Sequence, residues 1–312
     1  MSALLQELVF DSLPEGAVWP FDRTYVRPPH FHGQLECLLI TRGTAALHLG
    51  TRVARVRDGQ LCWILPGVPH VMSGFSPDFE MWVIQLDTTV VASCWREVSG
   101  QPRRPTLSPF DSWSVPLGEL LAGRAVTDVA GAERRALNEL AESVWTGSDP
   151  ARVRQALIAL CVLALRITRG NINTRRPLSI SELASCLLLT SPATDRPSAA
   201  SELGVSEGFL SRSVHRDLGV TFVEHRARTR VAHFLALVQQ GESNLLNAAL
   251  AAGFGSYSQF FRTFIRVSGS PPREYLRAGR RRTSLLVAGD CTHPETGPVV
   301  CLPDAQRQVA PL

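Results

Sequence analysis

Three histidines and one glutamate near the start of the chain have the types and the spacing of a polar binding site. His30, His32 and Glu36 are separated by even numbers of residues, so on one β-strand their side chains would lie on the same face. His70 follows the turn sequence Pro66-Gly67. Imidazoles and a carboxylate are ligands for zinc, iron, nickel or manganese. The set predicts a divalent-metal site, a polar pocket for an organic effector, or histidines that only hydrogen-bond at a barrel mouth.

A second constellation, in residues 244–266, has the pattern of a helix-turn-helix unit. An alanine-rich helix ends at Gly253, which can adopt the left-handed turn, and Ser256 and Gln259 are spaced to form a capping box for the next helix. Two phenylalanines one helical turn apart would anchor that helix to the core. Such a helix fits the major groove of DNA. The opposite face presents Tyr257, Ser258, Phe261 and Arg262.

A first copy of this pattern lies about 50 residues upstream, in residues 198–216. It repeats the helix of small residues, the turn at Gly204, the cap at Ser206 and two apolar anchors one turn apart. Residues 222–238, between the copies, predict a long helix that holds two recognition helices apart, and roughly 34 Å would match one repeat of DNA. The outward face of the first copy presents Glu207, Gly208, Ser211 and Arg212.

Short apolar or alternating runs bounded by Gly and Pro predict the strands that would position the histidines in an antiparallel sandwich or barrel. The runs are residues 36–40, 45–49, 52–56, 61–65 and 81–86. From about residue 130 the apolar period changes to that of a helix, and Pro150 stands at the first position of a second helix. Residues 178–278 are helical in pattern throughout.

These elements predict an α+β protein of two domains, a β-barrel followed by helices and then an all-α double helix-turn-helix. We expect an effector-binding domain in residues 1–125, a helical dimerisation and linker region in 126–176, the DNA-binding domain in 177–279 and a loose tail in 280–312.

The distribution of charge along the chain agrees with this division into domains. Residues 177–282 hold 13 arginines against 8 acidic residues, whereas residues 1–176 are nearly balanced, so the helical part is the predicted binder of a polyanion.

Cysteine usage and apolar runs bear on where the protein acts. The 7 cysteines are scattered without a C-x-x-C pair, which favours a reducing cytoplasm. No apolar run has the length of a membrane span. The sequence therefore predicts a cytoplasmic protein without membrane contact.

The stretch from about 178 to 278 resembles the DNA-binding domain of AraC/XylS transcription regulators. The specific part is A-x-x-x-G-F, then S-x-F-x-R-x-F at residues 258–264, then the run Gly269 to Tyr275. The resemblance implies that the outward residues of both copies read bases and that Arg216 and Arg266 neutralise phosphates. Ile265 replaces a usual basic residue, and Gly208 a usual bulky contact. The second recognition helix should therefore contribute the larger share of specificity.

The histidine runs resemble the two cupin motifs. H-x-H-x-x-x-E followed by Gly43 matches the first, and residues 59–70 come near the second. Effector domains of AraC-type regulators are commonly cupin barrels, so the two resemblances agree. Together they imply a homodimeric regulator that binds double-stranded DNA, contacts RNA polymerase and responds to a small molecule or a metal. No cofactor is required by this interpretation, although a divalent metal fits His30, His32, Glu36 and His70.

Two alternatives explain less of the chain. A metal-dependent cupin enzyme would use the same histidines but leave the duplicated helix pairs and their basic surplus unexplained, and a helical scaffold would leave the paired outward arginines unexplained. We therefore expect no enzymatic activity. Aromatic residues Trp63, Phe75 and Trp82 fit a core better than a ligand cage, and Cys37 and Cys62 fit buried thiols.

Overall fold

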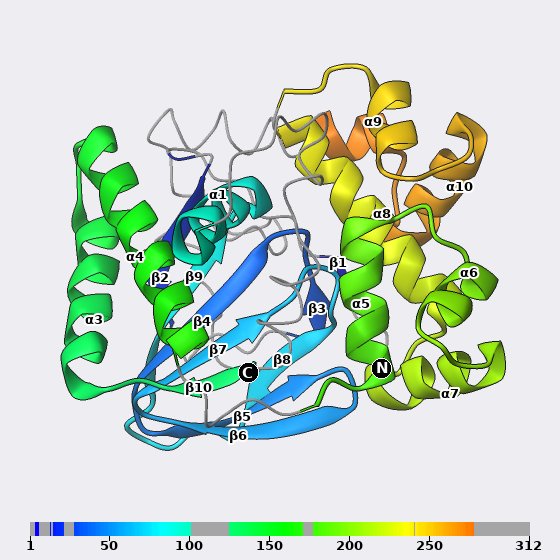
Figure 1. The fold of residues 1–312 in the computed structure, drawn as a ribbon. Helices are drawn as coiled ribbons and strands as arrows, with labels where there is room; N and C mark the ends of the chain where they lie inside the picture. Colours follow the sequence, from blue (N-terminus) through cyan, green and yellow to red (C-terminus); the bar gives the residue numbers. More distant parts are fainter. Residues whose placement is uncertain are drawn as a thin grey trace, which may run out of the picture.

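The computed structural model describes residues 4–5, 13, 15–21, 28–100, 125–170, 177–239 and 241–277. The expected linker residues 171–176 and the expected tail, 280–312, lie outside the described residues. The two-part α+β architecture predicted from the sequence is confirmed: a strand-rich half is followed by a purely helical one (Figure 1).

The first half folds into two five-stranded sheets that together resemble a jelly-roll barrel (Figure 1). One sheet has the order β1-β3-β8-β5-β6 and the other β10-β7-β4-β9-β2. The neighbouring strands pair antiparallel except β1 with β3. The strands are β1 (Leu4–Leu5), β2 (Gly16–Pro20), β3 (His30–Phe31), β4 (Leu35–Arg42), β5 (Thr44–Leu49), β6 (Arg52–Arg57), β7 (Gln60–Ile64), β8 (His70–Ser73), β9 (Glu80–Leu86) and β10 (Val126–Asp128).

Strand β4 shows why the apolar runs do not all alternate with polar residues. Leu38 and Ile40 point into the core between the sheets, whereas Cys37 and Leu39 point to the opposite face, which helices cover. A strand buried on both faces is apolar at successive positions. The same parity directs Glu36 to the barrel interior, together with Leu38 and Ile40.

Three helices cover the outer face of the second sheet (Figure 1). They are α1 (Thr88–Ser99), α3 (Gly131–Thr146) and α4 (Pro150–Gly170). Leu137, Ala141 and Val144 form the buried stripe of α3, which agrees with the helical period predicted from about residue 130. Trp63 is buried and donates its indole N–H to the Thr168 hydroxyl at 2.9 Å, which confirms a core role for it.

Cys37 and Cys62 are inert thiols in this fold. Cys37 and Cys62 are fully buried, and burial raises the pKa of Cys37 well above its ordinary value and that of Cys62 to about 12. A thiol reacts as its thiolate, so these two side chains act as apolar core residues, as the sequence predicted.

The second half consists of two helix-turn-helix units joined by one long helix. The helices are α5 (Ile180–Thr190), α6 (Arg196–Glu202), α7 (Glu207–Leu218), α8 (Phe222–Gln239), α9 (Leu245–Ala251) and α10 (Tyr257–Ser268). The recognition helices α7 and α10 have 12 residues each. Their N-caps, Ser206 and Ser256, and their C-caps, Gly219 and Gly269, are each 50 positions apart. The extra residue of the second unit therefore lies in its turn.

The N-cap of α10 differs from the predicted capping box. The Ser256 hydroxyl accepts a hydrogen bond from the Gln259 amide, as expected, but the Gln259 side chain accepts from the Gly255 amide instead of the cap residue. The longer turn brings the Gly255 N–H within reach at 2.8 Å. A complete capping box occurs at α5, between Ser179 and Glu182.

Helix α8 is buried along almost its whole length and carries two buried neutral histidines. Burial, with a smaller effect of the Arg228 charge, lowers the pKa of His225 to about 4, and burial lowers that of His233 to about 3. Above pH 6.5 both are neutral in the folded and the unfolded chain. Below it the unfolded chain binds protons first, so stability falls with falling pH, by roughly 1 kcal/mol per pH unit for each histidine, until the folded pKa is reached.

We therefore expect the urea midpoint to decrease between about pH 6.5 and pH 4, and less steeply in His225→Gln. Glutamine can still donate to the Ser185 hydroxyl, which lies 2.9 Å from Nε2 of His225. Urea titrations at several pH values measure the slope. An unchanged slope in the variant would show that His225 is protonated in the folded protein.

Three turns of the barrel dock against the helical half. The β5–β6 turn contacts the C-terminal end of α7, where the Thr51 amide donates to the Asp217 carbonyl at 3.0 Å. Gly33, in the turn before β4, and Gly67, before β8, lie against α8 at Ala232 and Thr229. The barrel and the DNA-binding helices are therefore joined along one seam, and α5 lies beside the barrel (Figure 1).

Gly50 makes the tightest of these contacts. Its φ is +62°, and a Cβ there would lie 2.4 Å from the Asp217 carbonyl oxygen. We expect Gly50→Ala to lower stability by about 1–3 kcal/mol and to accelerate hydrogen exchange at the C-terminal end of α7. Gly74→Ala is the matched control, because its φ is +60° and the nearest atom to a new Cβ is 4.0 Å away. Equal effects of the two changes would mean that backbone strain alone, without the docking contact, accounts for the loss.

Candidate ligand and DNA-binding sites

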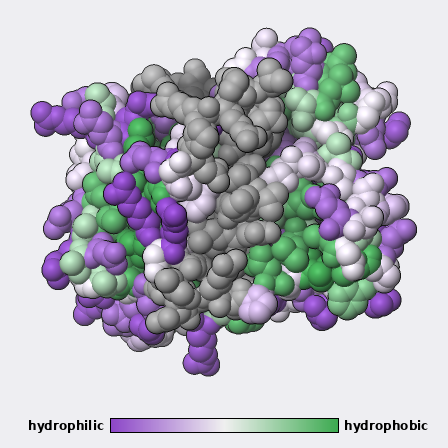
Figure 2. Space-filling view, viewed as in Figure 1, coloured by the Kyte–Doolittle hydropathy of each residue, from purple (hydrophilic) through white to green (hydrophobic). Residues whose placement is uncertain are grey.

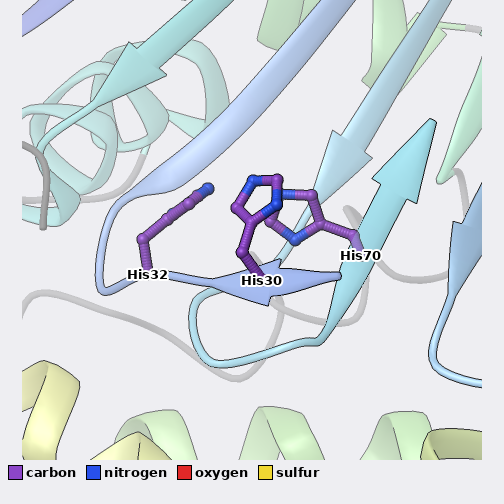
Figure 3. A group of neighbouring side chains, drawn as sticks. All are labelled: His30, His32 and His70. Carbon is purple, nitrogen blue, oxygen red and sulfur yellow. The ribbon is translucent and has the colours of Figure 1, made fainter. Parts of the chain in front are cut away.

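The structure brings the three predicted histidines together (Figure 3). His30 lies on β3 and pairs in register with His70 on β8, and His32 follows β3 directly. The sequence placed His30, His32 and Glu36 on one strand, and this is wrong: the chain turns at Gly33 and Gln34, between β3 and β4. Convergence therefore comes from a turn and from strand pairing, not from side-chain parity.

The three imidazoles form a compact buried group. His30 is 8% exposed, His32 1% and His70 4%. The ring centroids are 4.3 Å apart for His30 and His70 and 4.9 Å for His32 and His70. One ring nitrogen from each histidine lies within 4.8 Å of the other two, and Figure 3 shows the rings turned toward one another.

Backbone carbonyls select the tautomer of each ring. Nδ1 of His30 lies 3.0 Å from the Pro28 oxygen, Nδ1 of His32 lies 3.1 Å from the Gln34 oxygen, and Nδ1 of His70 lies 2.9 Å from the Val68 oxygen. A carbonyl can only accept, so each Nδ1 carries a proton and donates it. In the neutral ring, each Nε2 then keeps its lone pair. Histidines that bind metals are oriented in this way.

Glu36 adds a buried carboxylate to the group, as predicted. Its Oε2 lies 3.1 Å from Nε2 of His32 and its Oε1 lies 3.7 Å from Nε2 of His70. Burial alone would raise the pKa of Glu36, but the His70 charge and the hydrogen bond and charge of His32 outweigh it and hold that pKa well below its usual range. Burial, reinforced by His70 and His32, lowers the pKa of His30.

Gln85 on β9 is part of this site, and the sequence analysis missed it. Gln85 is fully buried and pairs in register with Glu36. Its side-chain amide donates to Glu36 Oε2 and lies 3.2 Å from Nε2 of His32. The available signal was a glutamine inside the apolar β9 run, at the parity of the interior residues Met81 and Val83.

The arrangement fits a transition-metal ion. The donor set of three imidazole nitrogens and one carboxylate suits Zn²⁺, Fe²⁺, Ni²⁺ or Mn²⁺. In a tetrahedral site with metal–nitrogen bonds of about 2.0–2.1 Å, ligand nitrogens lie about 3.3 Å apart. The observed upper limit of 4.8 Å requires only a small inward movement of the rings. The carboxylate would balance half of the ion's charge.

The predicted DNA-reading residues lie on the outer faces of α7 and α10. Arg212, Arg216, Ser258, Phe261, Arg262 and Arg266 are exposed, and Glu207, Ser211 and Tyr257 are half-buried. The anchors on the opposite faces, Leu210 and Val214 in α7 and Phe260 and Phe264 in α10, are fully buried. The two faces thus separate packing from contact with DNA, as expected for recognition helices.

Ion pairs distinguish the arginines of these faces. Arg216 pairs with Asp217, Arg266 pairs with Glu224, and Glu207 pairs with Arg196. Within the described residues, neither Arg212 nor Arg262 forms a salt bridge. Their guanidinium groups can bind a base edge or a phosphate without giving up an ionic partner.

Comparison with protein-family models decides the affiliation. The model of the AraC-like ligand binding domain matches residues 16–160. The model of a helix-turn-helix domain matches residues 199–278. Together the two cover more than two thirds of the chain. The chain belongs to the AraC family of transcription regulators. This AraC-type regulator combines an N-terminal ligand-binding domain with a C-terminal helix-turn-helix DNA-binding domain, as the sequence predicted.

Solved structures give only distant likenesses to this AraC-type regulator. Unsaturated fatty acid bound ToxT from Vibrio cholerae is 16% identical, over 84% of this chain and 94% of that one, with a TM-score of 0.42. The AraC-like transcriptional activator CuxR is 12% identical over 76% and 78%, with a TM-score of 0.33. Oxalate decarboxylase from Bacillus subtilis is 19% identical over 23% and 18%, with a TM-score of 0.18. No curated protein matches. These likenesses are too distant to indicate a function, and the family is shown by the two protein-family models.

Within the part of the chain that the structure describes, no helix is long and apolar enough to cross a lipid bilayer.

Proposed function

We propose that His30, His32, Glu36 and His70 bind a divalent transition metal and that this binding controls how the AraC-type regulator presents α7 and α10 to DNA. The observation that supports the proposal most strongly is the common tautomer of the three histidines. Three separate backbone carbonyls accept from the three Nδ1 atoms, and one ring nitrogen of each buried histidine lies within 4.8 Å of the other two.

Electrostatics favour a cation at this position. With Nδ1 of His32 bonded to the Gln34 oxygen, the 3.1 Å contact between its Nε2 and the Glu36 oxygen requires a second proton on the ring or another cation beside the two atoms. A bound ion would supply that positive charge. Gln85 orients both Glu36 and His32 through its amide, and such supporting contacts set ligand geometry.

Two of the binding residues adjoin turns that dock on α8: His32 directly precedes Gly33, and His70 follows the turn at Gly67. Phe31, between His30 and His32, lies under the Arg228 guanidinium, whose carbon is 4.9 Å from the ring centroid. Gly33 follows His32 and packs on Ala232. An inward movement of the rings therefore displaces residues in contact with the helix that joins both recognition units. A ligand shifts an equilibrium only if it binds one arrangement better than the other, and this connection provides the difference.

A sensing role is part of the proposal, in place of a catalytic one. All four residues are at most 8% exposed, which leaves little accessible surface for a substrate. We further propose that α3 and α4, on the side of the barrel away from the DNA-binding helices (Figure 1), form a homodimer contact. The regulator would act in the cytoplasm, where bacterial DNA lies, and would contact RNA polymerase there.

The test uses the full chain after treatment with a chelator. We expect one equivalent of Co²⁺ to bind with the visible absorption bands of a histidine-coordinated ion, and to change the affinity for DNA selected from a random pool. Absorption without a change in affinity would contradict control by the metal. Absence of absorption, with DNA binding intact, would contradict the metal site and leave a polar pocket for an organic effector.

A further inference from the structure

A cavity lies at the seam between the barrel and the DNA-binding helices, and none of the three histidines lines it. Its volume is about 360 Å³, at the lower end of the range for small-molecule pockets. Strands β5, β6 and β7 and the start of β10 line it on the barrel side, and α5 and the end of α7 line it on the other. Both halves of the molecule therefore contribute walls.

The walls are mainly apolar. Ala54 on β6 pairs with Leu47 and so faces the barrel interior at the open edge of the sheet. Val68 packs against three separate hydrophobic cores, two in the barrel half and one formed by α5, α6, α7 and α8. Figure 2 shows hydrophobic residues gathered on this side of the molecule, over α5 and α7. The apolar lining comprises Leu49, Val53, Ala54, Trp63, Ile64, Leu65, Val68, Ala125, Val126 and Leu218.

The polar groups of the lining already have partners within the protein. The Ser181 hydroxyl donates to Asp217 at 2.6 Å, and the Ser185 hydroxyl donates to the Ser181 carbonyl at 2.9 Å. At the rim, Arg52 of β6 and Glu182 of α5 form an ion pair of 2.9 Å across the seam. A charged ligand would have to break this pair and leave one of its members without a partner, which is costly.

We propose that this cavity is a second ligand site, for a neutral and mainly apolar small molecule. The ligand gains affinity from the apolar surface that it buries. Because it touches β6 and α5 together, it binds only while the barrel is docked on the DNA-binding helices. Its binding therefore stabilises the docked arrangement, independently of the histidine group.

The test titrates the full chain with N-phenyl-1-naphthylamine, a neutral fluorescent probe of apolar sites. We expect saturable binding to one site, weakened about tenfold or more by Ala54→Phe, which fills the cavity. Ala46→Phe is the matched control. Ala46 is also a half-buried alanine of this sheet, on β5, and does not line the cavity. Equal weakening by both variants, or by neither, would overturn the site.

A second variant tests whether both halves form the site. Arg52→Glu places two carboxylates face to face across the rim, so we expect it to open the seam and to weaken the probe about tenfold as well. Unchanged binding in Arg52→Glu would show that the barrel alone holds the probe and would overturn the bridging site. The titration is repeated on chelator-treated protein. Probe binding that is the same without metal shows that this site does not depend on the proposed metal site.

Discussion

Replacing His70 with alanine will weaken Co²⁺ binding about a hundredfold or more. Nε2 of His70 is one of three converging imidazole nitrogens, and even residues that only orient a metal ligand contribute about 10- to 100-fold to affinity. Loss of a ligand itself should cost at least as much. The visible absorption of the cobalt complex, followed during competition with a chelator, measures the affinity.

His48→Ala is the matched control for this change. His48 lies on β5 opposite Val71 of β8, on the other face of the sheet from His70, and bonds to Ser73 at 2.7 Å, so its loss removes a histidine without removing a residue of the proposed site. We expect its cobalt affinity to equal that of the unchanged chain. If both variants lose cobalt equally, the ion is bound elsewhere or the loss reflects unfolding, which circular dichroism of the same samples will distinguish.

Replacing Arg262 with alanine will lower affinity for the selected DNA by about 1–3 kcal/mol and relax the preference at one base position. Arg262 is exposed on α10, at the place that Arg212 holds on α7. Selection from a random DNA pool, carried out in parallel for both proteins, measures the preference. We expect Arg212→Ala to have the smaller effect, because Gly208 beside it supplies no side chain to the contact.

Arg277→Ala removes the same charge from an exposed position outside α10. A purely electrostatic contribution would weaken binding to every sequence alike and leave the selected motif unchanged. A motif that is the same for Arg262→Ala and the unchanged chain would therefore remove Arg262 from the set of base-reading residues.

Local signals predicted the helical half closely. Caps, turn glycines and anchors at one-turn spacing act within a few residues, so the sequence placed both recognition helices and the joining helix where the structure has them. The runs of β4 to β7 and β9 were likewise confirmed, because short apolar stretches between glycines leave few alternatives. The limits drawn at residues 125 and 176 stay a prediction, and β10, just after residue 125, pairs with β7.

Features that depend on contacts between distant residues were not predictable in the same way. The types of His30, His32 and His70 indicated a site, but the turn that brings them together is shaped by the approach of Gly33 to α8, about 200 residues along the chain. Gln85 joins Glu36 through strand pairing. The seam and its cavity have no local signature at all, because each wall is an ordinary apolar surface until the other is placed against it.

The equal spacing of the two recognition helices bears on how such a regulator can evolve. Their caps and buried anchors occupy corresponding positions, whereas the outward residues differ at nearly every corresponding position except the arginine pairs. Side chains that read DNA are thus outside the set that stabilises the fold. Substitutions at these surface positions can change the preferred operator without destabilising the fold, so they need no compensating mutation. One scaffold can therefore acquire new target genes by a few single mutations.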